Sequence, residues 1–547
     1  MTIDSKPIRA TEIAEQASIS SSVSYDEPVS DPGIINAPEE NALMNKKLED
    51  DNNSDIERQA LPPLPSQTER PSMLSDLDKG LVGWNSEDDP ENPYNWPKRR
   101  KTLTLTVVLI TAFMVPVGST LIAPGEQYIA KEYNVTNAIT RQITVSGYVL
   151  GFGWGPLLHA PLSEMYGRKY VIAASNFLLA VLSIGCSESH NISIFLAFRV
   201  LSGIMGCAGM VVGAGTISDM YRPNETGTAT AMFLLGPIMG PVMGPIWGGF
   251  IAQRAGWRWS IRVLEILAFT MTLAMIFVVS ETNPSVLLRK KANRLRKETG
   301  NNDLQSIIDS RQPVVPPLRK FVTNLSRAAR LLVTSPIVLA FALYMSLAYA
   351  YMYVFFTTIS TVLTERYGFA VETAGLAYIS VGCGTYFATI AVGSTNDKLV
   401  EYLTAKNGGV RIPEYRLGPM VVGSILLPAS LFWYGWSVQA HAHWVAVVIA
   451  MFPMGAGLIS SLLPIQAYLI DLYGPLGVAA SATAGMNLLR CTAAALIPLS
   501  VPRLIARLDY GWGYSLFGFL GILLCTTTSL IFVKFGKAFR MRYPPHA

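Results

Sequence analysis

The sequence contains little charge for its length, and its cysteines are few. Charged residues make up 15% of the 547 residues, whereas an average soluble domain has about 25%. This shortfall favours a membrane protein over a soluble one. The five cysteines lie in or beside apolar segments without the spacing of metal ligands. We therefore expect them to be packing residues, and we expect no metal site.

Several motifs that would indicate chemistry are also missing. No G-x-x-x-x-G-K-[ST] loop is present, which disfavours direct ATP hydrolysis. No paired acids or nucleophile arrangement in a soluble domain suggests an enzyme, and no cofactor is expected. Basic residues fall in loops beside apolar segments, which indicates a topological role rather than nucleic-acid binding.

The first 97 residues differ in composition from the rest. They hold 20 acidic and 7 basic residues, are rich in Ser, Asn and Pro, and show no sustained apolar periodicity. This composition predicts a disordered acidic tail over 1–97. Because the tail is polar, no signal peptide opens the chain, and the first apolar segment must direct membrane insertion.

Twelve apolar stretches of about 20 residues follow, each long enough to span a bilayer. They predict an all-α integral membrane protein with two bundles of six helices, 98–280 and 335–536. A basic linker, 281–334, separates the bundles, and a short tail, 537–547, ends the chain. The predicted spans are 103–124, 141–161, 170–187, 192–217, 226–251, 260–280, 335–358, 370–393, 416–436, 443–470, 475–501 and 511–534.

The distribution of basic residues predicts the orientation. With the N-terminus inside, 26 Lys and Arg flank the spans on the cytosolic side and eight on the outer side. This bias predicts that both termini are cytosolic. Under this topology the sequons at Asn134 and Asn191 face outward and are candidates for glycosylation.

An internal repeat predicts that the two bundles are related by pseudo-symmetry. Asp219 and Tyr221, at the end of the fourth span, match Asp471 and Tyr473 at the end of the tenth. The segment "APLSEMYGRK" after the second span has an echo in "GSTNDK" after the eighth, which ends near Asp397. Paired six-span repeats place a substrate site between halves and suggest alternating access.

The loop after the second span carries the first family resemblance. "APLSEMYGRK" resembles the cytosolic loop motif G-x-x-x-D-R-x-G-R-K of the major facilitator superfamily, although Met165 stands where the motif has Arg. The resemblance implies a conformational latch, to which we also assign the acids at the other span ends. The alternative is a tight turn with cytosolic positive charge. The latch candidates are Glu164, Gly167, Arg168, Lys169, Asp219, Asp397 and Asp471.

The fifth span, "GPIMGPVMGPIWGGF", resembles the motif G-x-x-x-G-P-x-x-G-G taken as a mark of antiporters in this superfamily. A four-residue period puts the glycines on one helix face, which favours close helix packing. We expect this face to pack against the opposite half near the outer end and to limit proton leakage. The alternative is a packing face without mechanistic role. The motif residues are Gly236, Pro237, Gly240, Pro241, Gly244, Pro245, Gly248 and Gly249.

The lineage is narrowed by "DDPENPYNWPKRRK" before the first span. It is similar to an element common in the fungal drug:H+ antiporters of twelve spans. The fourth-span motif beginning at Arg199 resembles that family too, where the corresponding arginine is linked to proton coupling. Arg199 and Glu265 are therefore our proton-coupling candidates; the alternatives are snorkelling of Arg199 and a rim pair of Glu265 with Arg262.

Aromatic and polar residues in the spans suggest a substrate cavity. In the seventh span Tyr344, Tyr351 and Phe355 recur at helical spacing and would suit bulky apolar molecules. Ordinary helix packing is the alternative. Arg490 lies deep in the eleventh span, where snorkelling is harder, so we place it beside the cavity. Further candidates are Tyr148, Trp154, Gln466 and Asn487.

These features predict a transporter driven by the proton gradient that exports small organic compounds such as drugs, toxins or secondary metabolites. We expect a monomer in the plasma membrane, rather than the vacuolar membrane, with substrate, protons and lipid as its partners. The alternatives are an H+ symporter for nutrient uptake, a polyamine exporter and a transporter-like receptor.

Overall fold

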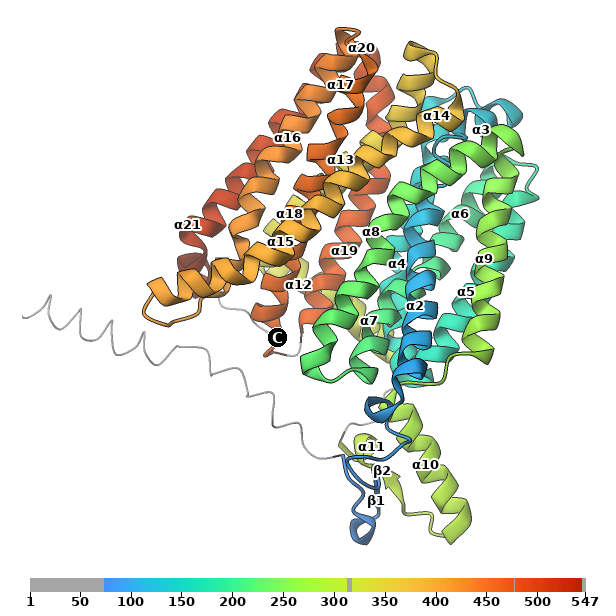
Figure 1. Cartoon of the computed structure of the whole chain (residues 1–547), viewed down its shortest axis with the longest axis vertical. Coiled ribbons are helices and arrows are strands. Elements are labelled where there is room, and N and C mark those ends of the chain that lie inside the picture. Colours follow the sequence, from blue (N-terminus) through green and yellow to red (C-terminus); the bar gives the residue numbers. More distant parts are fainter. Residues whose placement is uncertain (1–72, 312–316, 477, 544–547) are drawn as a thin grey trace, which may run out of the picture. The chain divides into compact units, whose positions relative to one another are not determined.

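The computed structural model describes residues 73–311, 317–476 and 478–543 (Figure 1). Predictions about residues 1–72 lie outside this part. The described chain is almost entirely helical, with one parallel pair of two-residue strands. In Figure 1, α10 and α11 lie at one end of the long helices, and α3 and α14 lie at the other. We refer to these as the α10 end and the α3 end.

The first six membrane helices span residues 98–277. The fourth helix is interrupted at Cys207, where α6 passes into α7. The short helix α3 connects the first and second spans. The bounds are α2 (Lys98–Thr120), α3 (Glu126–Glu132), α4 (Ala138–Tyr166), α5 (Arg168–Ser187), α6 (Ile192–Gly206), α7 (Ala208–Met220), α8 (Pro223–Arg254) and α9 (Trp257–Phe277).

The second six membrane helices span residues 336–542. Short turns of 3-10 helix join several of them, and a π-helical turn lies in the last. The bounds are α13 (Pro336–Tyr367), α14 (Val371–Ala374), η3 (Gly375–Tyr378), α15 (Ile379–Lys406), η4 (Pro413–Leu417), α16 (Gly418–Gln439), α17 (Trp444–Ile449), α18 (Met451–Tyr473), α19 (Ala479–Leu496), η5 (Ile497–Ser500), α20 (Val501–Gly521), η6 (Ile522–Thr526) and α21 (Thr527–Arg542).

The twelve predicted spans correspond to these helices. Ten stretches of the described chain are long and apolar enough to cross a membrane. One of them, Ala479–Arg542, contains two spans, because Asp509 takes a φ of 56° and breaks the helix inside α20. The second predicted span, α4, is not among the ten stretches. Its 29 residues include many glycines and polar residues, which lower its hydropathy. Most helices extend a few residues beyond the predicted apolar cores, because polar residues at a helix end are tolerated outside the hydrocarbon region.

Helix packing divides the spans into two bundles. In the first, α2 packs against α8, α5 against α9 and α4 against α6. In the second, α13 packs against α19, and α18 packs against both α15 and α16. The bundles meet where α4 contacts α19, and where α8 contacts α14, η3 and α15. The predicted fold class, an all-α protein with two six-helix bundles, is confirmed.

The segment before the first span is folded against the linker. Strand β1 (Leu81–Val82) pairs in parallel with β2 (Gln305–Ser306), beside η1 (Leu77–Lys79), η2 (Pro93–Asn95) and α10 (Pro284–Thr299). Trp84 is buried against Leu288 of α10 and Ile307 of α11 (Ile307–Arg311). Residues 73–97 therefore differ from the expected disordered tail, because their apolar and acidic side chains find partners in the linker.

The last part of the linker forms the amphipathic helix α12 (Pro317–Thr334). Its apolar side buries Ala328 and Leu331. The helix packs against α19 of the second bundle and α4 of the first. A Cβ at Gly485 of α19 would lie 3.0 Å from the Ala328 carbonyl oxygen, which shows how closely these two helices approach.

Candidate transport site

Polar and aromatic side chains meet where the two bundles face each other. The Ser119 hydroxyl of α2 and the Tyr353 hydroxyl of α13 lie 3.0 Å apart and share a hydrogen bond. Tyr353 contacts the ring of Tyr349, with centroids 5.4 Å apart. The Arg490 guanidinium of α19 lies 4.3 Å from the centre of the Tyr349 ring. This cluster joins helices of both halves deep within the membrane region.

Arg490 thus lies where the two halves meet, and its place beside a substrate cavity stays a prediction. It is buried, and its guanidinium donates to the side-chain oxygen of Asn487, one turn earlier on α19. Its Nε has no partner in the described chain. A buried guanidinium with an unused donor can bind a polar group on a substrate, because leaving such a donor unsatisfied is costly.

Helices α4 and α19 touch beside this cluster. A Cβ at Gly153 of α4 would lie 2.7 Å from the Cys491 Cβ of α19. Only glycine allows this approach without a shift of one helix. The contact brings the two bundles together at the level of the Arg490 cluster.

The predicted aromatic stripe of the seventh span lies on another face of α13. The Tyr344 hydroxyl bonds to Ser461 of α18 at 2.8 Å, and the Tyr351 hydroxyl donates to the Phe517 carbonyl at 2.5 Å. Phe355 packs edge-on against Tyr434. All three are buried inside the second bundle. This placement agrees with the alternative of ordinary helix packing. Tyr349 and Tyr353, on the face toward the first bundle, were missed, although they have the same helical spacing.

The remaining cavity candidates are scattered. Tyr148 is buried within the first bundle beside Arg199, with the guanidinium 4.9 Å from the ring centre. Trp154 is 47% exposed on the surface of α4 and lies outside the central cluster. Gln466 is half-buried on α18. The structure thus brings Arg490 and Asn487 together and leaves the others apart.

Arg199 is held inside the first bundle. It is 2% exposed, so it does not snorkel to a membrane surface. Its Nε donates to the Thr144 carbonyl of α4 at 3.3 Å, and its Nη2 donates to the Gly118 carbonyl of α2 at 3.0 Å. A guanidinium can bridge two carbonyls because its donors form a planar fork. Arg199 therefore ties together α2, α4 and α6.

Glu265 is only partly enclosed, and its role in proton coupling stays a prediction. It lies half-buried on α9, and neighbouring Arg262 pairs with Glu188 at 2.7 Å rather than with Glu265. The alternative of a rim pair with Arg262 is therefore absent from the described ion pairs, although Arg262 lies near enough to act on the carboxylate electrostatically.

A more enclosed carboxylate, Glu126, lies at the α3 end in the first turn of α3. It is 5% exposed and pairs with Arg141 of α4, whose Nε lies 3.2 Å from its Oε1. From the second bundle, Glu365 of α13 and Tyr378 of η3 face the same group. Burial raises the pKa of Glu126 to about 7, Arg141 lowers it, and Glu365 raises it further. Sequence reasoning missed Glu126 because it lies in a loop outside the apolar spans.

The glycines of α8 face α2, within the same half. A Cβ at Gly236 would lie 2.9 Å from the Leu109 carbonyl oxygen, and one at Gly244 would lie 3.1 Å from that of Val117. Gly240 and Gly248 meet Pro116 and Leu121 in the same way. The expectation that this face packs against the opposite half is therefore wrong for the four spaced glycines.

Another face of α8 does contact the opposite half at the α3 end. A Cβ at Gly249 would lie 2.9 Å from the Val371 carbonyl, and one at Gly375 would lie 2.7 Å from the Pro245 carbonyl. Arg254 pairs with Glu372 at 2.9 Å. The three prolines, Pro237, Pro241 and Pro245, lie inside one continuous helix of 32 residues. Helix α8 thus packs closely against α2 with one face, and with another face it contacts the second bundle at the α3 end.

At the α10 end, Arg168 is the centre of the loop motif. Its Nε donates to Asp219 at 3.1 Å and its Nη1 to the Ser163 hydroxyl at 2.7 Å. The backbone N–H groups of Arg168 and Lys169 donate to Glu281, at 2.8 and 3.2 Å. Gly167 adopts a φ of 103°, which lets the Glu281 carboxylate approach its backbone. Asp219 and Glu281 both hold the loop, and the latch role of the exposed Glu164 stays a prediction.

The second bundle repeats this arrangement. Arg416 donates to Asp471 at 2.6 Å and also lies 3.4 Å from Asp397. Glu414 pairs with Arg540 near the C-terminal end of α21 at 2.8 Å. Asp219 and Asp471 therefore occupy equivalent places, as the internal repeat predicts. Glu281 and Glu414 were missed because neither lies in a repeated motif.

Both sequon asparagines are exposed at the α3 end. Asn134 lies after α3 with a φ of 51°. The Asn191 side chain caps α6 and accepts the Ser193 N–H at 2.8 Å. Their glycosylation stays a prediction.

Comparisons with known proteins agree with this architecture. A family profile described as the Major Facilitator Superfamily matches residues 108–498. The chain is 40% identical to the MFS-type transporter penM of Penicillium rubens over 85% of its length and 90% of that protein. It is 36% identical to the efflux pump radE of Floropilus chiversii, covering 83% of this chain and 84% of that one.

Solved structures share the fold at low sequence identity. The xylose transporter XylE from E. coli, in a partially occluded inward-open conformation, superposes with a TM-score of 0.56 at 16% identity. The match covers 80% of this chain and 98% of XylE. Two bundles of six helices, the pseudo-symmetric charge pairs and these matches lead to one conclusion. The chain belongs to the major facilitator superfamily and is a multi-pass membrane transporter.

Proposed function

We propose that this transporter exports small organic compounds in exchange for protons. The observation that carries the proposal is the buried Glu126–Arg141 pair, which faces Glu365 of the other half at the α3 end. A carboxylate in this position changes its environment whenever the two halves separate. Similarity to the efflux pump radE and the antiporter-like sequence of α8 support outward transport.

The cycle follows from the properties of this pair. We infer that the protein lies in the plasma membrane. Its α3 end then faces outward, and its α10 end faces the cytosol. When the α3 end opens and substrate leaves, Glu126 becomes hydrated and binds or releases protons at the outer pH. Closure buries the carboxylate again, which favours its protonated form. Proton uptake therefore promotes closure of the α3 end and the return toward the cytosol.

Substrate recognition is assigned to the central cluster. Arg490 has an unused Nε donor, and Tyr349 and Tyr353 offer aromatic faces beside it. Such a site suits compounds with an apolar body and a polar acceptor. The Gly-rich contact of α8 with α2 lets α8 move as one unit with the first bundle, which helps couple closure at the α3 end to the rest of that half.

The test uses purified protein in vesicles with an imposed pH gradient and fluorescent amphipathic compounds as probes. Exchange of probe against protons, abolished by Glu126→Gln, is expected. Movement of probe in the same direction as protons would support the nutrient symporter instead. Absence of any gradient-dependent movement would refute proton coupling.

A further inference from the structure

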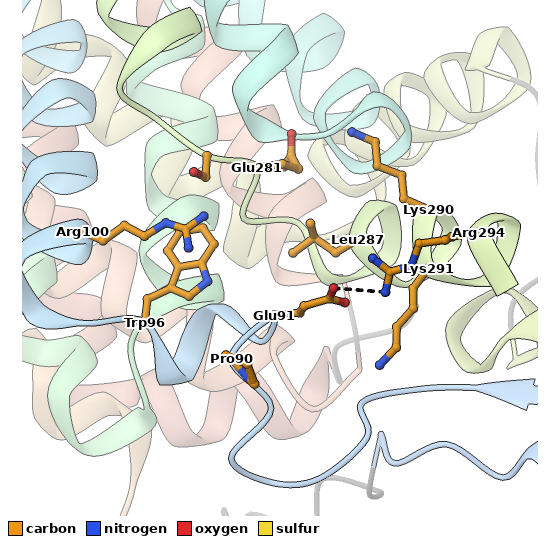
Figure 2. Close-up of a pocket in the computed structure, with 10 residues that line it drawn as sticks. Pro90, Glu91, Trp96, Arg100, Glu281, Leu287, Lys290, Lys291 and Arg294 are labelled. Atoms are coloured by element: carbon orange, nitrogen blue, oxygen red, sulfur yellow. Dashed lines mark hydrogen bonds and ion pairs between the residues drawn. The ribbon is translucent and has the colours of Figure 1, made fainter. Parts of the chain in front are cut away.

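A cavity of about 400 Å³ lies at the α10 end, between the start of α2, the end of α9 and α10 (Figure 2). It is separate from the central cluster and takes no part in the proposed transport cycle. Four of its lining side chains are basic and two are acidic. The basic ones are Arg100, Lys290, Lys291 and Arg294, and the acidic ones are Glu91 and Glu281.

Ion pairs account for one of the acids, Glu91, and for two of the cations. Lys291 pairs with Asp89 at 3.1 Å, in a contact that is almost completely buried. Arg294 pairs with Glu91 at 3.1 Å, as Figure 2 shows. Glu281 accepts backbone N–H groups from the loop after α4, as described above. Its carboxylate is therefore already saturated with donors.

Arg100 and Lys290 remain without a carboxylate partner in the described part of the chain. The Arg100 guanidinium stacks on the Trp96 ring, 3.7 Å from its centre. The Lys290 amine lies 3.3 Å from the Tyr170 hydroxyl and 5.0 Å from the centre of its ring. Each cation is thus held by an aromatic side chain, which positions it without neutralising it. Two uncompensated cations beside one cavity favour an anionic ligand.

The surroundings of the cavity are apolar and lie at the edge of the membrane helices. Phe277, which is 81% exposed, ends α9, and the exposed Val278 follows it, just before Ser280 of the cavity wall. Leu103 is exposed one turn after Arg100 on α2, and Tyr170 is half-exposed on α5. An acyl chain could cover these side chains while a headgroup fills the cavity. Exposed apolar residues would gain nothing from a free anion.

We propose that this cavity binds the phosphate group of an anionic membrane lipid, with Arg100 and Lys290 as its two principal ligands. Guanidinium and ammonium groups form charge-assisted hydrogen bonds with phosphate oxygens. Arg294 adds a third donor when Glu91 shifts, since both side chains are exposed. The phosphate ester is the shared chemistry of a lipid headgroup and of a soluble inositol phosphate, and the experiment separates these two sources.

The experiment measures lipid retention by the full-length protein in phosphatidylcholine nanodiscs that contain phosphatidylinositol phosphate. Native mass spectrometry counts the bound lipid as its content is varied, and soluble inositol phosphate serves as the competitor. The test variants are Arg100→Gln and Lys290→Gln. Matched controls remove the same charge from exposed neighbours, Arg99→Gln on α2 and Lys297→Gln on α10. Monodispersity of each variant is checked before binding is measured.

We expect each test variant to weaken lipid binding by about tenfold or more, because each loses a charged hydrogen bond. The control variants should lose only the few-fold attraction of one surface charge. Equal losses in all four variants would overturn the proposal, since they would indicate surface attraction alone. If soluble inositol phosphate binds as tightly as the lipid, the claim that the phosphate group belongs to a membrane lipid is overturned. Because Lys290 is exposed, Lys290→Gln keeps the test valid if Arg100→Gln fails to fold.

Discussion

The pH dependence of closure at the α3 end tests the role of Glu126 directly. In the closed arrangement burial raises its pKa from the ordinary 4.5 to about 7. If the opened end restores the ordinary value, this difference corresponds to about 3 kcal/mol in favour of closure at low pH. The stabilisation is fully present below pH 4.5 and is lost as the pH rises through 7. Closure should therefore follow acidification of the side that the α3 end faces.

The assay uses a pair of spin labels at exposed positions of the two halves. Lys131 on α3 and Thr373 on α14 are exposed and lie at the α3 end. Cys383, the exposed cysteine of the described chain, is first replaced by serine so that only the introduced cysteines react. Electron spin resonance then gives the fraction of short distances at each pH. In the otherwise unmodified protein this fraction should rise as the pH falls through 7.

The variant Glu126→Gln removes the titration while keeping the shape of the side chain. Its closed fraction should stay high and constant across the same pH range. The matched control is Glu132→Gln on the same helix. Although burial raises the pKa of Glu132, hydrogen bonds from Arg258 and Trp257 hold it below its ordinary value. A Glu126→Gln protein that titrates like the parent would refute the reasoning, as would a parent whose closed fraction does not change with pH.

Three further variants test other parts of the structure. Gly248→Leu should lower the melting temperature and abolish transport, because overpacking against α2 costs about 1–3 kcal/mol. Gly227→Leu, on the same helix with nothing within 4 Å of its Cβ position, should change neither, and equal effects would contradict the glycine contact. Asp89→Asn should expose residues 73–97 to limited proteolysis, since losing one partner of a buried ion pair costs about 3–5 kcal/mol. The control Asp88→Asn changes an exposed residue and should leave proteolysis unchanged. Arg199→Lys should lower both melting temperature and transport, because one amine cannot replace both carbonyl contacts, each worth about 1–3 kcal/mol; a fully active variant would show that the bridge is dispensable.

The membrane helices could be predicted because their signal is local. A run of about 20 apolar residues defines a span without knowledge of its neighbours. The charge pairs of Arg168 with Asp219 and of Arg416 with Asp471 were partly visible, since the internal repeat marks both acids. The break at Asp509 was visible only as an approximate boundary, because its unusual backbone conformation leaves no clear signature in composition.

Orientation within the bundle could not be read from periodicity. The seventh helix is buried on most of its surface, so spacing alone does not tell which aromatic face meets the opposite half. Tyr344 and Tyr353 both belong to regular patterns, yet they lie in different surroundings. The same limit applies to the glycines of α8, whose period predicts close packing but does not name the partner helix.

Buried carboxylates in loops were the other residues that could not be predicted from the sequence. Glu126, Glu281 and Glu414 lie outside the apolar spans, where acidic residues are usually solvated. Their burial depends on cations and backbone N–H groups that are distant in sequence, such as Arg540 for Glu414. A search for acids one or two residues beyond each span end would have found Glu126 and Glu281 among its candidates.

The pairing of β1 with β2 has a consequence for biosynthesis. Residues 81–82 leave the ribosome before any span, and their partners 305–306 leave it only after the sixth. The two strands can therefore meet only after the whole first bundle has been inserted with both its ends on one side of the membrane. A bundle with a misinserted helix would hold the strands on opposite sides. The small sheet can thus form only when the first half of the transporter is complete and correctly inserted.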